Sequence, residues 1–160
     1  MNKKKKLLSI IVLLVCLLGG GLAWYFFQPS PPKEKLKEDT QAVGYDPKLK
    51  KPKNFSTKQV ALPGFTQIVA KEGERSVDIA LANPSFNNVY FKYIVLFDKT
   101  GEKLIETDLI APGKAIKKMP IPEKISPGKY TLTIIIKTYD KKNKAELNGG
   151  SNKVPLVIEK

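Results

Sequence analysis

The side chains in this sequence most able to do chemistry are three carboxylates in one stretch expected to be a strand. Glu102, Glu106 and Asp108 are separated by even numbers of residues, so on a regular β-strand they would share one face. Paired carboxylates can act as general acid and base, and several together can bind calcium. The residues between them alternate as on any amphipathic strand, so we expect a solvent-exposed face with no catalytic residue and no metal site.

Other common active sites lack the residues they need. The sequence has no histidine, and its one cysteine, Cys16, lies in an apolar N-terminal run. Catalytic triads, cysteine–histidine pairs and the usual zinc sites are therefore not available. Gly149-Gly150 precedes no helical pattern, so a phosphate-binding loop is not expected either. The sequence predicts a protein that is not an enzyme and has no cofactor.

Recognition is the remaining class of function, and two polar loops, residues 83–88 and 146–152, are candidates for it, together with Tyr90 beside the first loop. Their candidate residues are Asn83, Phe86, Asn87, Tyr90, Asn148 and Asn152. Loops at the ends of a β-sandwich often carry binding sites. Phe86 and Tyr90 could stack on a sugar, whereas Tyr93 is expected in the core. Packing of both aromatic rings against the domain itself is the alternative.

The N-terminus has the pattern of a membrane anchor. Its basic residues are Lys3, Lys4, Lys5 and Lys6. The uncharged run that follows, residues 7–27, would form a helix of about 31 Å, which matches a hydrocarbon core of roughly 30 Å. Two of its closing aromatic residues, Trp24 and Tyr25, favour the membrane interface. By the positive-inside rule, residues 1–6 are cytoplasmic and the C-terminal part is extracellular.

A cleaved signal peptide is the alternative to an anchor. Gly21-Leu22-Ala23 could serve as a small-residue cleavage site, with the product starting at Trp24. The apolar run, however, continues past Ala23 and is longer than the roughly 7–15 residues of a signal peptide. Val15 before Cys16 does not suit a lipoprotein. We expect an uncleaved signal anchor, and the sequence leaves cleavage after Ala23 open.

Residues 28–54 read as a charged, flexible linker. They contain five prolines, seven lysines and four acidic residues, and few large apolar ones. Fully extended at about 3.1 Å per residue, they would reach roughly 80 Å. Positive charge here favours the membrane surface or an anionic wall polymer, while nucleic acid is not expected outside the cell.

Residues 55–160 show seven short alternating segments and no convincing helix. The expected strands cover residues 60–70, 76–82, 89–97, 102–110, 114–121, 129–139 and 153–159. Seven strands at this spacing predict a single immunoglobulin-like sandwich, closest to fibronectin type III because the antibody-type cysteines are missing. Tyr130, after Pro127 and Gly128, is placed as in a tyrosine corner, where its hydroxyl bonds to an upstream backbone group. These three residues are expected to be structural.

Six stretches carry a resemblance to known proteins. They are Leu62-Pro63-Gly64-Phe65, Leu81-Ala82-Asn83-Pro84, Tyr90-Phe91-Lys92-Tyr93, Thr100-Gly101-Glu102, Pro112-Gly113-Lys114 and Gly128-Lys129-Tyr130. Through them, residues 60–160 resemble small, N-terminally anchored surface proteins of Gram-positive bacteria with one immunoglobulin-like domain. That group has no established activity, so the resemblance implies a location and a fold but no functional residues.

Together these features predict a single-pass membrane protein with an extracellular, non-catalytic module for protein interaction or structure. Its expected partner is a surface or secretion protein. Two alternatives stay open, a wall-polymer or glycan-binding module and an inhibitor or regulator of an exported enzyme.

Overall fold

The computed structural model describes residues 36–56 and 58–160, and within them the chain forms eight β-strands and no helix. The strands are β1 (Val43–Gly44), β2 (Ile68–Lys71), β3 (Ser76–Asn83), β4 (Val89–Phe97), β5 (Glu102–Glu106), β6 (Lys114–Pro120), β7 (Gly128–Asp140) and β8 (Glu146–Glu159). This confirms the all-β prediction. The predicted span at residues 7–27 lies outside the described residues, and no helix that could cross a membrane occurs within them.

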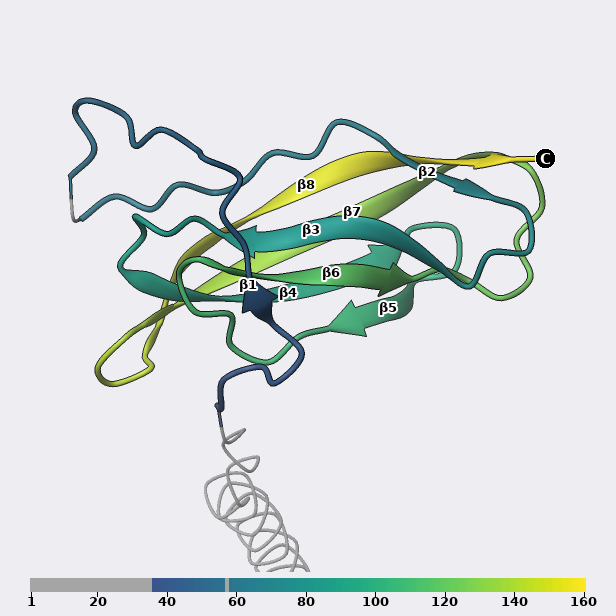
Figure 1. Ribbon diagram of the computed structural model, residues 1–160. Coiled ribbons are helices and arrows are strands. Elements are labelled where there is room, and N and C mark those ends of the chain that lie inside the picture. Colours follow the sequence, from purple (N-terminus) through teal and green to yellow (C-terminus); the bar gives the residue numbers. More distant parts are fainter. Residues whose placement is uncertain (1–35, 57) are drawn as a thin grey trace, which may run out of the picture. The chain divides into compact units, whose positions relative to one another are not determined.

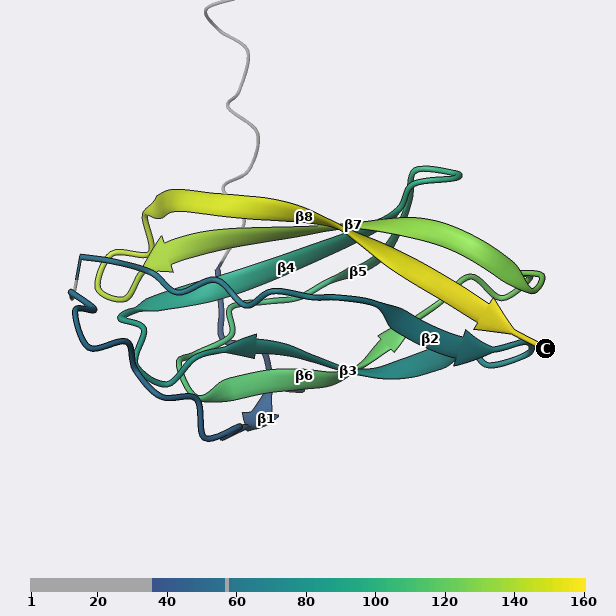
Figure 2. The same cartoon turned by 90° about the horizontal axis from the view of Figure 1, so that it is seen from above.

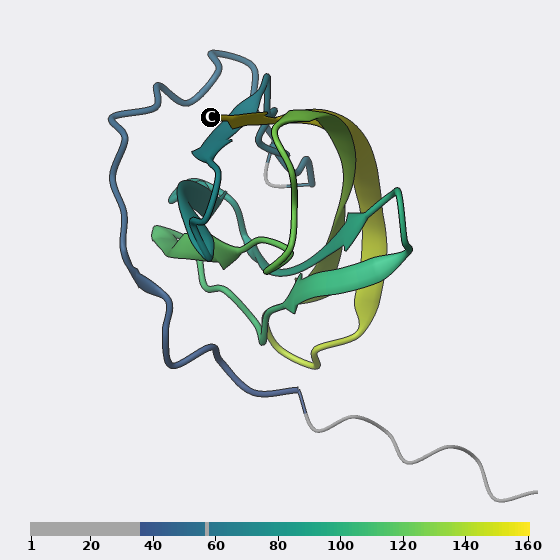
Figure 3. The same cartoon turned by 90° about the vertical axis from the view of Figure 1, so that its right-hand side faces the viewer.

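The strands form two sheets that face each other (Figures 1 and 2). The smaller sheet has the order β1-β6-β3, and the larger has the order β2-β8-β7-β4-β5. Neighbours are antiparallel except for β2 and β8, which are parallel. Viewed along the strands, the two sheets enclose the core (Figure 3). In this arrangement β3 and β2 are edge strands of different sheets.

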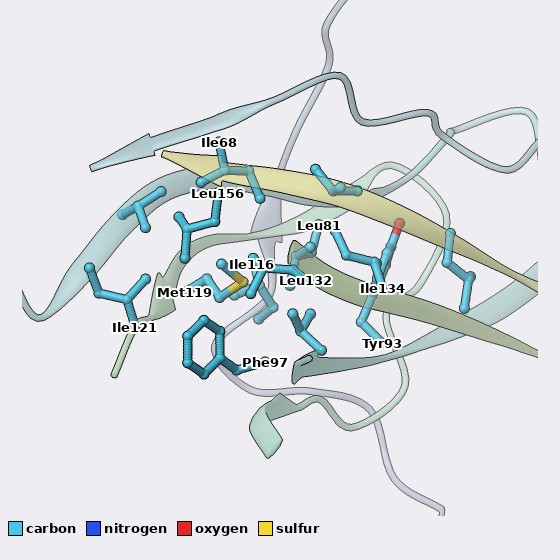
Figure 4. Close-up of a cluster of buried hydrophobic side chains, with 14 of the residues drawn as sticks. Ile68, Leu81, Tyr93, Phe97, Ile116, Met119, Ile121, Leu132, Ile134 and Leu156 are labelled. Atoms are coloured by element: carbon cyan, nitrogen blue, oxygen red, sulfur yellow. The ribbon is translucent and has the colours of Figure 1, made fainter. Parts of the chain in front are cut away.

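The core comes from the alternation of apolar residues along these strands. In β4, Phe91, Tyr93 and Val95 are fully buried between the sheets, as the period of two predicts. Side chains of both sheets meet around Ile116, Met119 and neighbouring residues (Figure 4). The Tyr93 hydroxyl donates a hydrogen bond of 2.7 Å to the carbonyl oxygen of Ala82, so its polar group is satisfied inside the core. Burial raises the pKa of Tyr93 well above its usual value.

Three strands differ in extent from the prediction. Strand β2 covers only the end of the expected segment 60–70, because Pro63-Gly64 interrupts it. Strand β5 ends at Glu106, although residues 107–110 still bond to β4. Strand β8 begins at Glu146, within what was expected to be a loop up to residue 152. Gly149 makes this extension possible, since a Cβ there would lie 2.1 Å from the carbonyl oxygen of Ile136.

The largest difference concerns residues 36–45, which we call the docked segment. The compact unit runs Leu36–Lys160 and so includes residues that the sequence assigned to the linker. The amide of Asp39 donates to the carbonyl oxygen of Leu109 at 2.9 Å, and the amide of Leu109 donates to the carbonyl of Lys37 at 2.9 Å. Further along, β1 pairs with β6, which adds an eighth strand to the seven expected. The docked segment therefore lies along the edges of both sheets.

Candidate functional site

The three carboxylates of the predicted strand do not form a site. The pairing of β4 with β5 shifts register between Val95 and Leu96, so Glu102 lies opposite Phe97 whereas Glu106 lies opposite Ile94. These two carboxylates therefore point to opposite faces, and the expectation of one shared face was wrong, because an irregularity breaks the period of two. No group of metal-ligating side chains forms in the described part of the chain.

Glu106 instead belongs to an ion-pair cluster. It contacts Lys103 and forms an ion pair with Lys92, in which Nζ of Lys92 lies 2.9 Å from Oε1 of Glu106. The Lys92 side chain is only 3% exposed. Hydrogen bonds from Lys103 and then Lys92 lower the pKa of Glu106. A carboxylate held ionised in this way is a poor general acid at neutral pH. Its role is to balance the buried ammonium of Lys92.

The first candidate loop, residues 83–88, is held together by two buried amides. The side-chain nitrogen of Asn83 donates to the carbonyl oxygens of Val89 (2.8 Å) and Ile110 (2.9 Å). The Asn87 nitrogen donates to the Asn83 side-chain oxygen at 3.0 Å, and the Asn87 oxygen accepts from the amide of Ala61 at 2.9 Å. Both side chains are thus committed to the fold, which leaves Phe86 and Tyr90 as the partly exposed residues here.

Phe86 and Tyr90 each have a partner of their own. The rings of Phe86 and Phe55 pack edge to face with centroids 5.1 Å apart. The Tyr90 hydroxyl donates a 2.8 Å hydrogen bond to Glu38. Glu38 raises the pKa of Tyr90, chiefly because it accepts this hydrogen bond from the protonated hydroxyl. Sequence alone could identify neither partner, because both come from the stretch before residue 56.

The second candidate region lies on β8 rather than in a loop. Asn148 and Asn152 are exposed, and the Asn148 carbonyl oxygen accepts a 2.7 Å hydrogen bond from the Thr138 hydroxyl. Residues 61 and 62 lie between this region and the first loop. The carbonyl oxygen of Ala61 accepts a hydrogen bond from the Asn87 side chain. The Leu62 side chain lies against Gly150, since a Cβ added to Gly150 would be 2.7 Å from Cδ1 of Leu62. The two candidate regions therefore flank one segment of the chain.

A groove of about 400 Å³ opens between the two edge strands. Its walls come from three separate stretches, represented by Tyr45 and Leu49, by Phe65 and Val69, and by Ile79 of β3. Leu49 and Val69 are 57% and 46% exposed, and Asp78 is the one charged residue in the lining. Sequence reasoning missed this groove because it expected a strand over residues 60–70, where the chain is irregular up to the start of β2 at Ile68.

Beside the groove runs a lysine loop, defined as residues 46–56. It holds Lys48, Lys50, Lys51 and Lys53, and none of these forms an ion pair with any described residue. Lys117 of β6 lies close to the start of the loop, with its Nζ 4.2 Å from the centroid of the Tyr45 ring. The loop therefore places four lysines without an ion pair in the described part of the chain next to an apolar groove.

Known proteins give no further guide to the site. The chain matches no protein-family model and no curated protein.

Proposed function

We propose that this chain is a single-pass, membrane-anchored surface protein whose extracellular domain is a non-catalytic protein-interaction module. The basic N-terminus and the apolar residues 7–27 support the anchor and its orientation. The groove beside β3 supports the binding role. The resemblance to anchored surface proteins of Gram-positive bacteria, noted above, favours the same location.

We further infer that the sandwich is immunoglobulin-like, closest to fibronectin type III. In such domains strands A, B, E and D form one sheet, and C, F and G form the other. The pair β3–β6 suits B and E, and the run β4–β7–β8 suits C, F and G. With this assignment, β1 takes the place of strand D, while the place of strand A beside β3 is not filled by any described residue.

The open edge of β3 is the observation that carries the binding role. An edge strand presents unpaired backbone groups, and an added strand of another polypeptide satisfies them. The apolar groove wall formed by Leu49, Phe65 and Val69 offers a surface on which apolar side chains of such a strand can pack. The ligand that fits both features is an extended segment of a partner protein.

Site-specific photocrosslinking in living cells tests this role. A benzophenone amino acid at Val69 lies in the groove, and one at Leu147 of β8 is the matched control, because the two side chains are 46% and 44% exposed. We expect a discrete protein adduct from the Val69 position of the full-length protein and none from Leu147. Adducts from both positions, or from neither, would contradict a groove-specific protein partner.

The proposed location has its own test. Cell fractionation with intact-mass measurement and protease treatment of whole cells should find the full-length chain in the membrane, with its domain cleaved from outside. A shorter product that starts at Trp24 and is free in the medium would show that the protein is secreted. In that case, soluble targets would replace membrane-bound ones as the proposed partners.

A further inference from the structure

We propose that the lysine loop, residues 46–56, binds a linear anionic polymer of the cell envelope through the ammonium groups of Lys48, Lys50, Lys51 and Lys53. The inference rests on the proposed extracellular location but does not depend on the groove as a protein-binding site. It assigns the polymer-binding alternative to specific residues, none of which belongs to the two loops expected from the sequence.

Segregation of charge is the first argument. Between Pro47 and Ala70 the chain contains five lysines and no acidic residue. Elsewhere in the described residues six lysines have a carboxylate partner, as in the pairs Lys37–Asp108 at 3.5 Å and Lys137–Glu146 at 3.1 Å. The lysine loop, with four lysines and Asp46 as its one acidic residue, attracts a polyanion and releases the small ions bound to that polymer.

The second argument is that the loop contains two internal turns and is joined to the rest of the domain through the Phe55 ring. The Asp46 side chain accepts a 2.8 Å hydrogen bond from the amide of Lys48, which fixes the first turn. At the other end, the amide of Phe55 donates to the carbonyl oxygen of Pro52 at 3.1 Å, and the Phe55 ring packs on Phe86. A fixed loop loses less conformational entropy on binding than a free linker would.

The position of the loop favours a polymer over the lipid surface. The chain leads from the predicted anchor into the domain at Leu36, where the docked segment begins. The lysine loop follows the other end of that segment, after β1 (Figure 1). The docked segment therefore separates the loop from the point at which the domain connects to its anchor.

Binding to linear inorganic polyphosphate is the test, with the full-length protein in nanodiscs of zwitterionic lipid. One variant replaces Lys48, Lys50, Lys51 and Lys53 with glutamine. The matched control replaces four other exposed lysines that have no ion pair among the described residues, namely Lys124, Lys129, Lys141 and Lys142. Both variants lose four charges and keep Lys3 to Lys6, so they differ only in where the charge is lost.

We expect the loop variant to bind at least about tenfold more weakly and the control less than about threefold more weakly. Each phosphate contact on a flexible single chain contributes about 0.7 to the slope of the logarithm of the binding constant against the logarithm of the salt concentration. Loss of four contacts should therefore make this slope shallower by about 3, for the loop variant only.

Equal losses of affinity in the two variants would overturn the proposal and show diffuse attraction, as would no loss in either. Loop-dependent binding to phosphatidylglycerol vesicles without binding to polyphosphate would identify the membrane as the ligand and also overturn it. None of these results bears on the crosslinking at Val69, so the two proposals fail separately.

Discussion

The hydroxyl of Tyr90 donates a 2.8 Å hydrogen bond to Oε1 of Glu38, a residue 52 positions earlier in the chain. Strand β4 is thereby joined to the docked segment. Lys114 of β6 lies 3.8 Å from the other carboxylate oxygen of Glu38. One acidic side chain therefore contacts residues of both sheets, and it holds the docked segment at the point where the segment passes from one sheet to the other.

Replacing Tyr90 with phenylalanine should loosen the docked segment without unfolding the domain. Loss of one hydrogen bond at a partly exposed site costs about 0.5–1 kcal/mol. We expect the amide of Asp39, which is bonded to Leu109, to exchange with deuterium about two- to fivefold faster. Tyr45→Phe is the control, since the Tyr45 hydroxyl makes no hydrogen bond within the described residues, and unchanged exchange in Tyr90→Phe would show that the contact contributes nothing.

Asn83→Ala should be strongly destabilising. The substitution removes three buried hydrogen bonds, two to the carbonyl oxygens of Val89 and Ile110 and one from the side-chain nitrogen of Asn87. The Ile110 carbonyl oxygen keeps its bond from the amide of Phe91, and the Asn87 nitrogen keeps its bond to the carbonyl oxygen of Ala61. We expect the free energy of unfolding, measured with urea on the full-length protein in detergent, to fall by about 2–4 kcal/mol. Asn88→Ala, at an exposed position of the same loop, should change it by less than about 0.5 kcal/mol. A similar small change at Asn83 would contradict a structural role for its amide.

Glu106→Gln should destabilise the domain at neutral pH and not at acidic pH. Its pKa in the folded state is below the ordinary value of 4.5, so the ionised form contributes stability above that pH, and this contribution disappears as the pH falls through the folded-state pKa. We expect a loss of about 1–2 kcal/mol at pH 7 because less negative charge then faces the buried Lys92. The difference between variant and wild type should shrink as the pH falls below 4.5 and vanish once Glu106 is protonated in the folded state. Glu102→Gln, which breaks no ion pair in the described residues, should match the wild type at both pH values.

Gly149→Ala should distort the junction of β7 and β8. The added Cβ would lie 2.1 Å from the carbonyl oxygen of Ile136, so one of the two backbones has to move. We expect a loss of roughly 3 kcal/mol or more in the free energy of unfolding. Gly64→Ala is the matched control, because no atom lies within 4 Å of a Cβ built there. Equal stability of the two variants would show that β8 begins later than Glu146.

The sequence predicted best those strands whose signals are local. The bounds of β3, β4 and β6 differ by at most one residue from the predicted ones, because alternation marks each strand and turn residues mark its ends. Gly101 and Gly113 adopt positive φ angles of 73° and 78° at such turns, where glycine is favoured. The Tyr130 hydroxyl donates a 2.9 Å hydrogen bond to the carbonyl oxygen of Ser126, the kind of upstream contact that a tyrosine corner makes.

The remaining features depend on contacts between distant residues. Strand β1 has only two residues, too few for any alternation, and it exists because the edge of β6 was available. The register shift that separates Glu102 from Glu106 leaves no mark in the sequence. The groove combines three stretches that are far apart in the chain. For these reasons Phe86 and Tyr90 could be proposed from the sequence, whereas the lysine loop as part of a fixed surface could not.

The docked segment also has a mechanical consequence. If the chain is anchored before residue 36, as proposed, any force that pulls the domain from the cell acts first on Leu36 and peels the segment from the sheet edges one contact at a time. The backbone bonds of Asp39, Leu109 and Tyr45 would break in turn, and Ala42, which packs against the core, would leave with the segment. Ten released residues have a contour length of about 34 Å at about 3.4 Å each, and the tether would lengthen by that length minus the distance that the docked segment already spans. The protein thus has a built-in reserve of length that absorbs tension while the core stays folded.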